Sequence, residues 1–182
     1  NGCSDLKSIK IPASVTSIGK DALRGCSGLI SLIVDEGNTV YDSRGNCNAL
    51  IETATNRLII GCNNTIIPDD VTSISDYAFY GCNAFESIII PSGVTTIGQN
   101  AFEECISLES IELPESVRSI GKAAFYNCSA LKSIVIPDSV TILNDFLFDG
   151  CSSLASVSSS TTSSLAMWNS AISTAQNIVL RQ

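Results

Sequence analysis

A 23-residue repeat is the feature of this chain that most restricts how it can fold. The segment VTTIGQNAFEECISLESIELP at residues 94–114 returns as VRSIGKAAFYNCSALKSIVIP at residues 117–137. A period of this length is typical of stacked-repeat architectures, in which one unit is too small to bury its own apolar face. The same period separates the prolines Pro68, Pro91, Pro114 and Pro137. We therefore expect a solenoid.

The β-branched end of each repeat predicts a short strand. In LESIELP, residues 108–114, Ile111 and Leu113 are two positions apart, so both should face the interior. Ser110 and Glu112 should then face solvent. The spacing of the leucine and the two aliphatic residues is also that of a leucine-rich repeat strand. A proline can follow directly, because the hydrogen-bonded ladder need not continue there.

An Ala-Phe pair followed by a cysteine marks the opposite side of each repeat. We expect the ring, Phe102 for example, to stack on the rings of neighbouring repeats and fill the interior. A small residue in the same turn is shared by several repeats and predicts a backbone with positive φ, which glycine adopts at no steric cost. The residues at this position are Gly19, Gly98, Gly121 and Asn144.

These positions combine into the pattern IPxSVxxIGxxAFxxCxxLxxI over residues 3–157. The pattern resembles the BspA-like, or type 5, leucine-rich repeats of bacterial surface antigens and some protist surface proteins. The resemblance implies a repeat solenoid of the leucine-rich type, with a strand and a short helical or irregular turn in each 23-residue coil. It also implies a secreted or surface-attached protein with a role in adhesion. It brings no catalytic residue and no shared ligand.

Two segments depart from the repeat. Within residues 1–157, which we assign to the solenoid, an insert at about 38–66 contains two strand-like runs, Ala49 to Thr53 and Arg57 to Ile60. We interpret them as a β-hairpin that replaces the helical-turn side of one repeat, and favour a structural variant over a recognition element. Residues 158–182 begin with a Ser/Thr tract, which can be a flexible linker. We predict that they continue as a helix-strand cap; the apolar residues at helical spacing are Leu165, Trp168, Ile172 and Ala175.

Composition excludes several classes of function. The chain has no histidine, so neither a Ser-His-Asp triad nor a histidine metal site can form. Its net charge of −8 opposes binding to a phosphate backbone, and we expect no nucleic-acid partner. No apolar run approaches the roughly 20 residues of a membrane span, so we expect no membrane insertion by this segment. We predict no enzymatic activity and no cofactor or metal.

Eight cysteines raise the question of disulfides. Six of them share one repeat position: Cys3, Cys26, Cys82, Cys105, Cys128 and Cys151. Cysteines on adjacent coils should point the same way, whereas a disulfide needs two side chains turned toward each other. We therefore predict a buried ladder of free thiols. Cys47 and Cys62 flank the expected hairpin symmetrically, and a disulfide and a free pair remain equally good interpretations.

The outward positions of the strands are the candidate binding site. Isoleucine and valine occupy positions where a solvated strand would carry more charge, which is typical of a protein-binding surface. An equally good explanation is that β-branched residues simply suit strands. The candidate residues are Ile33, Ile66, Ile89, Glu112, Val135, Ser87, Ser110 and Ser133.

The sequence thus predicts a non-enzymatic interaction module of the adhesion type. We expect its partner to be a protein on a host or neighbouring cell, and its location to be extracellular or on the cell surface, with any signal or anchor outside this segment. The alternative is a spacer or self-assembling surface element without a specific ligand. Two glycosylation motifs, at Asn63 and Asn127, we interpret as chance matches.

Overall fold

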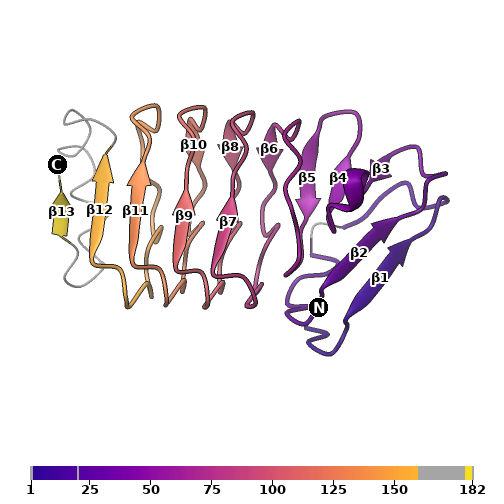
Figure 1. The fold of residues 1–182 in the computed structure, drawn as a ribbon, viewed down its shortest axis with the longest axis horizontal. Coiled ribbons are helices and arrows are strands. Elements are labelled where there is room, and N and C mark those ends of the chain that lie inside the picture. Colours follow the sequence, from indigo (N-terminus) through magenta and orange to yellow (C-terminus); the bar gives the residue numbers. More distant parts are fainter. Residues whose placement is uncertain (1, 20, 160–178, 182) are drawn as a thin grey trace.

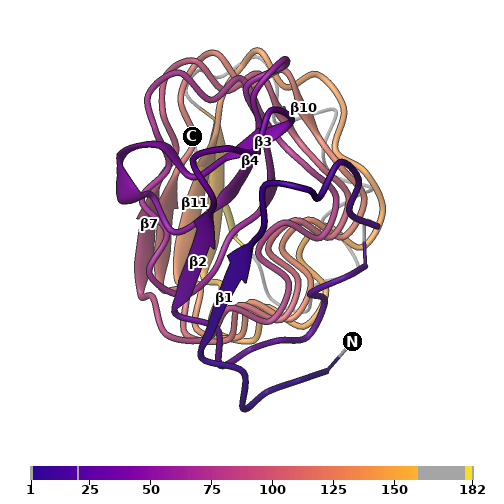
Figure 2. The ribbon, with the colours of Figure 1, turned by 90° about the vertical axis from the view of Figure 1, so that its right-hand side faces the viewer.

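The chain winds into a stack of coils whose strands lie side by side along the long axis (Figure 1). This is a computed structural model, and it describes residues 2–19, 21–159 and 179–181. Figure 2, which looks along the stack, shows that the later coils superimpose closely, whereas the path of the first coils, with β1 and β2, departs from theirs. Stacking of this kind follows from the repeat, because each coil offers the next one the same apolar edge.

One long face of the stack is a parallel sheet, here called the main sheet. Its strands pair in register, so that Ser87 lies beside Ser110, Ser110 beside Ser133, and Ser133 beside Ser156. Inward residues such as Ile111 and Ile134 are buried. In spatial order the strands are β7 (Ser87–Ile89), β9 (Ser110–Glu112), β11 (Ser133–Ile136), β12 (Ser156–Ser159) and β13 (Val179–Arg181).

A second sheet runs along another side of the coils. Its parallel part is formed by the short V-x-x-I segments, in which Ile74, Ile97 and Ile120 are buried. In spatial order its strands are β10 (Ser119–Ile120), β8 (Thr96–Ile97), β6 (Ser73–Ile74), β5 (Arg57–Ile60), β4 (Leu50–Glu52) and β3 (Tyr41–Asp42). The first coils form a separate parallel pair, β1 (Ser8–Ile11) and β2 (Ser31–Val34).

A column of phenylalanine rings fills the interior. Phe79, Phe102, Phe125 and Phe148 stack with ring centroids 5.0, 5.6 and 6.0 Å apart and nearly parallel planes. All four are buried. The column ends against Gly61, where a Cβ atom would lie 2.1 Å from the Phe79 ring. Glycine at this point therefore lets the first ring pack against the backbone of the inserted segment.

The inserted segment extends the second sheet. β4 and β5 pair antiparallel, and β5 pairs in parallel with β6, so that Leu58 lies beside Ile74. The sequence interpretation placed these strands on the turn side of the coil instead. Leu58 and Ile60 alternate as inward residues, and this alternation gives β5 the same role as the V-x-x-I segment of an ordinary coil. A one-turn 3₁₀ helix, η1 (Arg44–Asn46), precedes β4.

The predicted positive φ at Gly98 and Gly121 is wrong, and Gly19 does not have it either. At Gly98 and Gly121, glycine is needed for a close approach between coils. A Cβ atom on Gly98 would lie 2.4 Å from the amide nitrogen of Asp76, and one on Gly121 would lie 2.4 Å from that of Gln99. The left-handed residues lie later in the turn: Tyr77, Asn100, Ala123 and Phe146 before the Ala-Phe position, and Gly81, Glu104, Asn127 and Gly150 before the cysteine.

Two further expectations concern the ends of the chain. Cys3 is exposed, so it does not belong to the buried ladder. The predicted cap helix, from Leu165 to Ala175, lies outside the described residues. Strand β13, next to that segment in the chain, pairs in parallel with β12.

Across the part of the chain that the structure describes, no helix has the length and apolar character needed to cross a membrane.

Candidate protein-binding surface

Six of the eight candidate residues come together on the main sheet. Ser87, Ser110 and Ser133 form one exposed line across β7, β9 and β11. Two residues further along each strand, Ile89 lies beside Glu112, and Glu112 beside Val135. The Ile89 side chain is 84% exposed and that of Val135 is 51% exposed. With Ser158, which lies beside Val135 on β12, these residues form what is here called the strand-face row: Ile89, Glu112, Val135 and Ser158.

The other two candidates are exposed but stand apart from the main sheet. Ile33 is 49% exposed and lies on β2, in the separate pair formed with β1. Ile66 is 76% exposed and belongs to no strand. Its amide donates a hydrogen bond to the carbonyl of Cys47 in the inserted segment. The row is therefore continuous only from β7 onward. Alignment of the repeats with one another could not show this break. The insert changes the path of the backbone, but the repeat residues around Pro68 stay the same.

A shallow hollow lies over β7 and β9. Its volume is about 420 Å³, and its lining includes Ile89, Glu112 and the half-buried Leu113. Pro114, Ser87 and Ser110 also line it. The hollow thus offers an aliphatic wall, one carboxylate and two hydroxyl groups, which is the mixture of apolar and polar groups that protein-binding surfaces use.

The charges beside the row are unevenly paired. Lys132, which precedes Ser133 of β11, holds Glu109 through a 2.5 Å ion pair, whereas the Lys10–Asp35 pair at 2.8 Å lies away from the row, at the separate strands β1 and β2. Glu112 is exposed and has no ion-pair partner among the residues that the structure describes. Glu112, which lines the hollow, therefore carries an uncompensated negative charge and lies between Ile89 and Val135 along the row.

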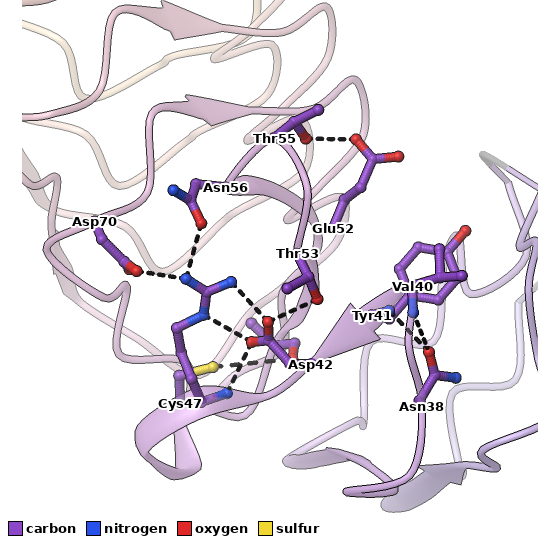
Figure 3. A network of polar contacts seen from close by, with 12 residues as sticks. Asn38, Val40, Tyr41, Asp42, Cys47, Glu52, Thr53, Thr55, Asn56 and Asp70 are labelled. Atoms are coloured by element: carbon purple, nitrogen blue, oxygen red, sulfur yellow. Dashed lines mark hydrogen bonds and ion pairs between the residues drawn. The ribbon is translucent and has the colours of Figure 1, made fainter.

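The insert carries a polar network that the sequence analysis did not identify. Arg44 donates to both oxygens of Asp42, to the side-chain oxygen of Asn56 and to the carboxylate of Asp70, which Figure 3 shows converging. Thr53 donates a further hydrogen bond to Asp42. The network joins segments 26 residues apart and so fixes the loop around η1. The only sequence signal was an arginine close to an aspartate, which is too common to indicate a network.

The pKa values in this network follow its hydrogen bonds. Burial acts to raise the pKa of Asp42, but the hydrogen bonds from Arg44 and Thr53 outweigh it and hold that pKa below its ordinary value. The hydrogen bonds that Arg44 makes to Asp42 and Asp70 raise the pKa of Arg44. Both groups are therefore charged at neutral pH.

A second hollow of about 540 Å³ lies between this loop and the strands β1 and β2.

The eight cysteines are free, and all but Cys3 are buried. Three thiols donate to the phenylalanine carbonyl of the preceding coil, at 3.0–3.1 Å: Cys105 to Phe79, Cys128 to Phe102 and Cys151 to Phe125. Burial raises the pKa of Cys82 and of Cys105 far above the ordinary value for a thiol. A buried thiol that keeps its proton is a poor nucleophile, so the ladder is structural and not a reactive site.

Cys47 and Cys62 are not bonded to each other. An irregularity between Leu50 and Ile51 shifts the pairing of β4 and β5 by one residue. Cys47 consequently packs in the larger apolar cluster, with the phenylalanine column, while Cys62 packs in the smaller one near β1 and β2. Each thiol donates to a backbone carbonyl instead, Cys47 to Ala49 and Cys62 to Asn48.

Neither glycosylation motif presents a free asparagine. Asn63 is buried; its side chain donates to the Ser27 carbonyl and accepts from the amide of Ala84. Asn127 donates to Glu104 and precedes the buried Cys128. Within the described ranges, no group of three or more His, Cys, Asp or Glu side chains could hold a metal ion.

Comparison with known proteins gives consistent matches to one repeat family. The family model of the BspA type leucine-rich repeat region matches six copies, over residues 1–46 and 59–171. A leucine-rich repeat protein from Eubacterium ventriosum is 30% identical with a TM-score of 0.76, over 84% of this chain and 42% of its own. A leucine-rich cell surface protein from Faecalibacterium prausnitzii is 30% identical with a TM-score of 0.65, over 94% of this chain and 52% of its own.

A more distant structure shares the fold alone. The pneumococcal vaccine antigen PcpA is 20% identical with a TM-score of 0.70, over 97% of this chain and 56% of its own. This chain thus spans about half the length of the solved structures that it matches. A search of curated proteins gave no significant match.

Proposed function

This chain belongs to the BspA-type leucine-rich repeat family, and on that premise we propose that it is an extracellular or cell-surface module that binds another protein through its main sheet. The module is not an enzyme. Its partner is a protein on a host or neighbouring cell, and binding serves adhesion. The likeness to a leucine-rich cell surface protein supports this location.

The observation that carries the proposal is the exposure of Ile89 and Val135. Val135 projects from the middle strand of the main sheet and Ile89 from its edge strand β7, on a face where a purely solvated sheet would carry polar residues. Ile89 and Glu112 line a hollow, and Val135 lies beside Glu112 on the next strand, so the two aliphatic side chains belong to one continuous surface. Single exposed apolar residues, by contrast, would need no explanation. Ser87, Ser110 and Ser133 add hydrogen-bonding groups without bulk, so a partner can approach the sheet closely.

We assign a structural role to the two irregular segments. Residues 38–66 form a variant coil held in place by the Arg44 network, which supports scaffolding rather than direct recognition. Residues 158–182 serve as a cap over the last coil, and the pairing of β13 with β12 supports this assignment.

Aspartate substitutions at Ile89 and Val135 test the binding surface. The double variant I89D/V135D should lose capture of purified cell-surface and extracellular-matrix proteins arrayed on a chip, while its thermal unfolding stays within a few degrees of wild type. The exposed Ile142, which is not on the main sheet, supplies the matched control variant I142D. Equal capture by all three proteins would exclude the main sheet as the site. Concentration-dependent oligomers, with no protein captured by wild type, would favour the spacer alternative.

A further inference from the structure

The distance between neighbouring residues of the strand-face row restricts which secondary structure of a partner can bind along it. Its residues come from neighbouring strands of one sheet, which are about 4.8 Å apart. From Ile89 to Ser158 there are therefore three steps, or about 14 Å. A partner that contacts the whole row must place one side chain on its own surface about every 5 Å.

An α-helix meets this requirement better than an extended chain. One face of a helix, read at the alternating three- and four-residue spacing, presents a side chain about every 5.3 Å, so three steps cover about 16 Å. One face of a strand presents a side chain about every 6.7 Å, and three steps cover about 20 Å. Three steps along the helix are therefore about 2 Å longer than the row, a difference that side chains can accommodate. Three steps along the strand are about 6 Å longer, which is about one full residue step.

The charge on the row selects the chemistry of the helix. Ile89 and Val135 offer aliphatic surface on either side of Glu112, whose carboxylate has no partner among the described residues. The lysine near the row, Lys132, is already engaged by Glu109. A cationic side chain on the partner would therefore find Glu112 available, and the chain's net charge of −8 attracts it from a distance.

We infer that the main sheet binds an amphipathic α-helix of a partner protein, laid across β7, β9, β11 and β12, with an aliphatic stripe interrupted by one lysine or arginine that pairs with Glu112. The helix contacts Ile89 and Val135 with its aliphatic residues and places its basic residue between them. Ser87, Ser110 and Ser133 lie beneath one edge of the helix, where their small side chains leave room for it. This inference rests on the proposed protein-binding function and adds the class of partner.

Designed helices test it without knowledge of the natural partner. The probe is a hydrocarbon-stapled 15-residue helix with leucine at the contact positions and one lysine between them, labelled for fluorescence anisotropy with the intact chain. A second probe carries glutamate in place of that lysine. A third carries the lysine but is unstapled and has a central proline, which prevents the helix. Wild type should bind the lysine helix about fivefold more tightly than the glutamate helix at low salt, the range expected for an exposed ion pair.

Charge reversal at the row gives the decisive comparison. E112K should reverse the preference, so that the glutamate helix binds more tightly. E115K makes the same change in net charge three residues away, beyond the end of β9, and should leave the preference as in wild type. The difference should shrink at 0.5 M salt, because exposed charges are screened.

Three results would overturn the inference: no binding of the lysine helix, equal effects of E112K and E115K, or equal binding of the proline probe. These outcomes are separate from the fate of the proposed function. If I89D/V135D abolishes capture of arrayed proteins while the helix probes fail, the main sheet binds proteins of another shape. If the double variant captures proteins as well as wild type does, the main sheet is not the binding surface at all.

Discussion

At the scale of single residues, two kinds of glycine hold the coils together for different reasons. Gly81 has a φ of 72°, and a Cβ atom there would meet nothing closer than 3.9 Å. It is needed for its left-handed backbone. Gly98 has an ordinary backbone, but its Cβ atom would lie 2.4 Å from the Asp76 amide of the neighbouring coil. Gly98 is needed because a side chain at this position would push the two coils apart.

Paired substitutions separate these two reasons. G81A should cost about 1 kcal/mol of unfolding free energy, because alanine is strained at positive φ. G81N should cost less, since asparagine tolerates that conformation. At Gly98 both substitutions should cost about 2 kcal/mol or more, because any side chain pushes two backbones apart. Urea denaturation of the four variants measures this. If G98A were as mild as G81N, the coils would not be in close contact at Gly98.

The phenylalanine column gives the largest effect expected from one residue. Phe102 is fully buried between Phe79 and Phe125, with centroids 5.0 and 5.6 Å away. F102A should lower the free energy of unfolding by about 3–5 kcal/mol, because it removes the ring and leaves a cavity that rigid coils on both sides cannot close. F102L is the milder control. Denaturant titration gives both values, and a loss below about 1 kcal/mol for F102A would mean that the ring is not in the core.

At the scale of an element, the thiol ladder makes the fold sensitive to alkaline pH. Cys82, Cys105 and Cys128 are buried, and their pKa values are raised far above the ordinary value. For Cys82 and Cys105 the main cause is burial; for Cys128 it is a hydrogen bond with Cys151, followed by burial. In the unfolded chain these thiols ionise near pH 8.5. Above that pH the unfolded state loses protons that the folded state keeps, so stability falls as pH rises.

Urea denaturation between pH 7.5 and 9.5, with reductant present, should show this loss. Each buried thiol should contribute roughly 1 kcal/mol per pH unit above its unfolded pKa, and the contributions of the ladder add. C105A removes one ionisable group and should reduce the slope by one thiol's share, whereas C3A, at the exposed cysteine, should leave it unchanged. Identical slopes for wild type and C105A would show that the ladder does not control the alkaline limit.

At the scale of the whole molecule, the sequence period predicted the features that every coil shares and did not predict local departures of the backbone. The strand positions of Ile111 and Ser110, and the ring column, follow from alternation and spacing alone. The close approach at Gly98 could not be predicted, because glycine has two uses and only three-dimensional contact distinguishes them. The one-residue irregularity that separates Cys47 from Cys62 also left no trace in the pattern. The break in the row at Ile66 has the same origin, since a local change of backbone path alters no repeat residue.

Deletion of one coil tests the modular nature of the whole solenoid. Removing residues 92–114 would join Pro91 to Glu115 and restore the register, since the deleted length is one period. Contacts in the stack run between neighbouring coils, so Phe79 should stack on Phe125 in place of Phe102. The shortened chain should remain folded, shorter by about 4.8 Å in small-angle scattering, with a denaturant m-value reduced by about one coil's share. Deleting only 92–107 removes less of the chain but does not preserve the period, and it should unfold the chain. If the 92–114 deletion unfolded as well, stability would depend on contacts between distant coils, and the stack would be one cooperative domain rather than an array.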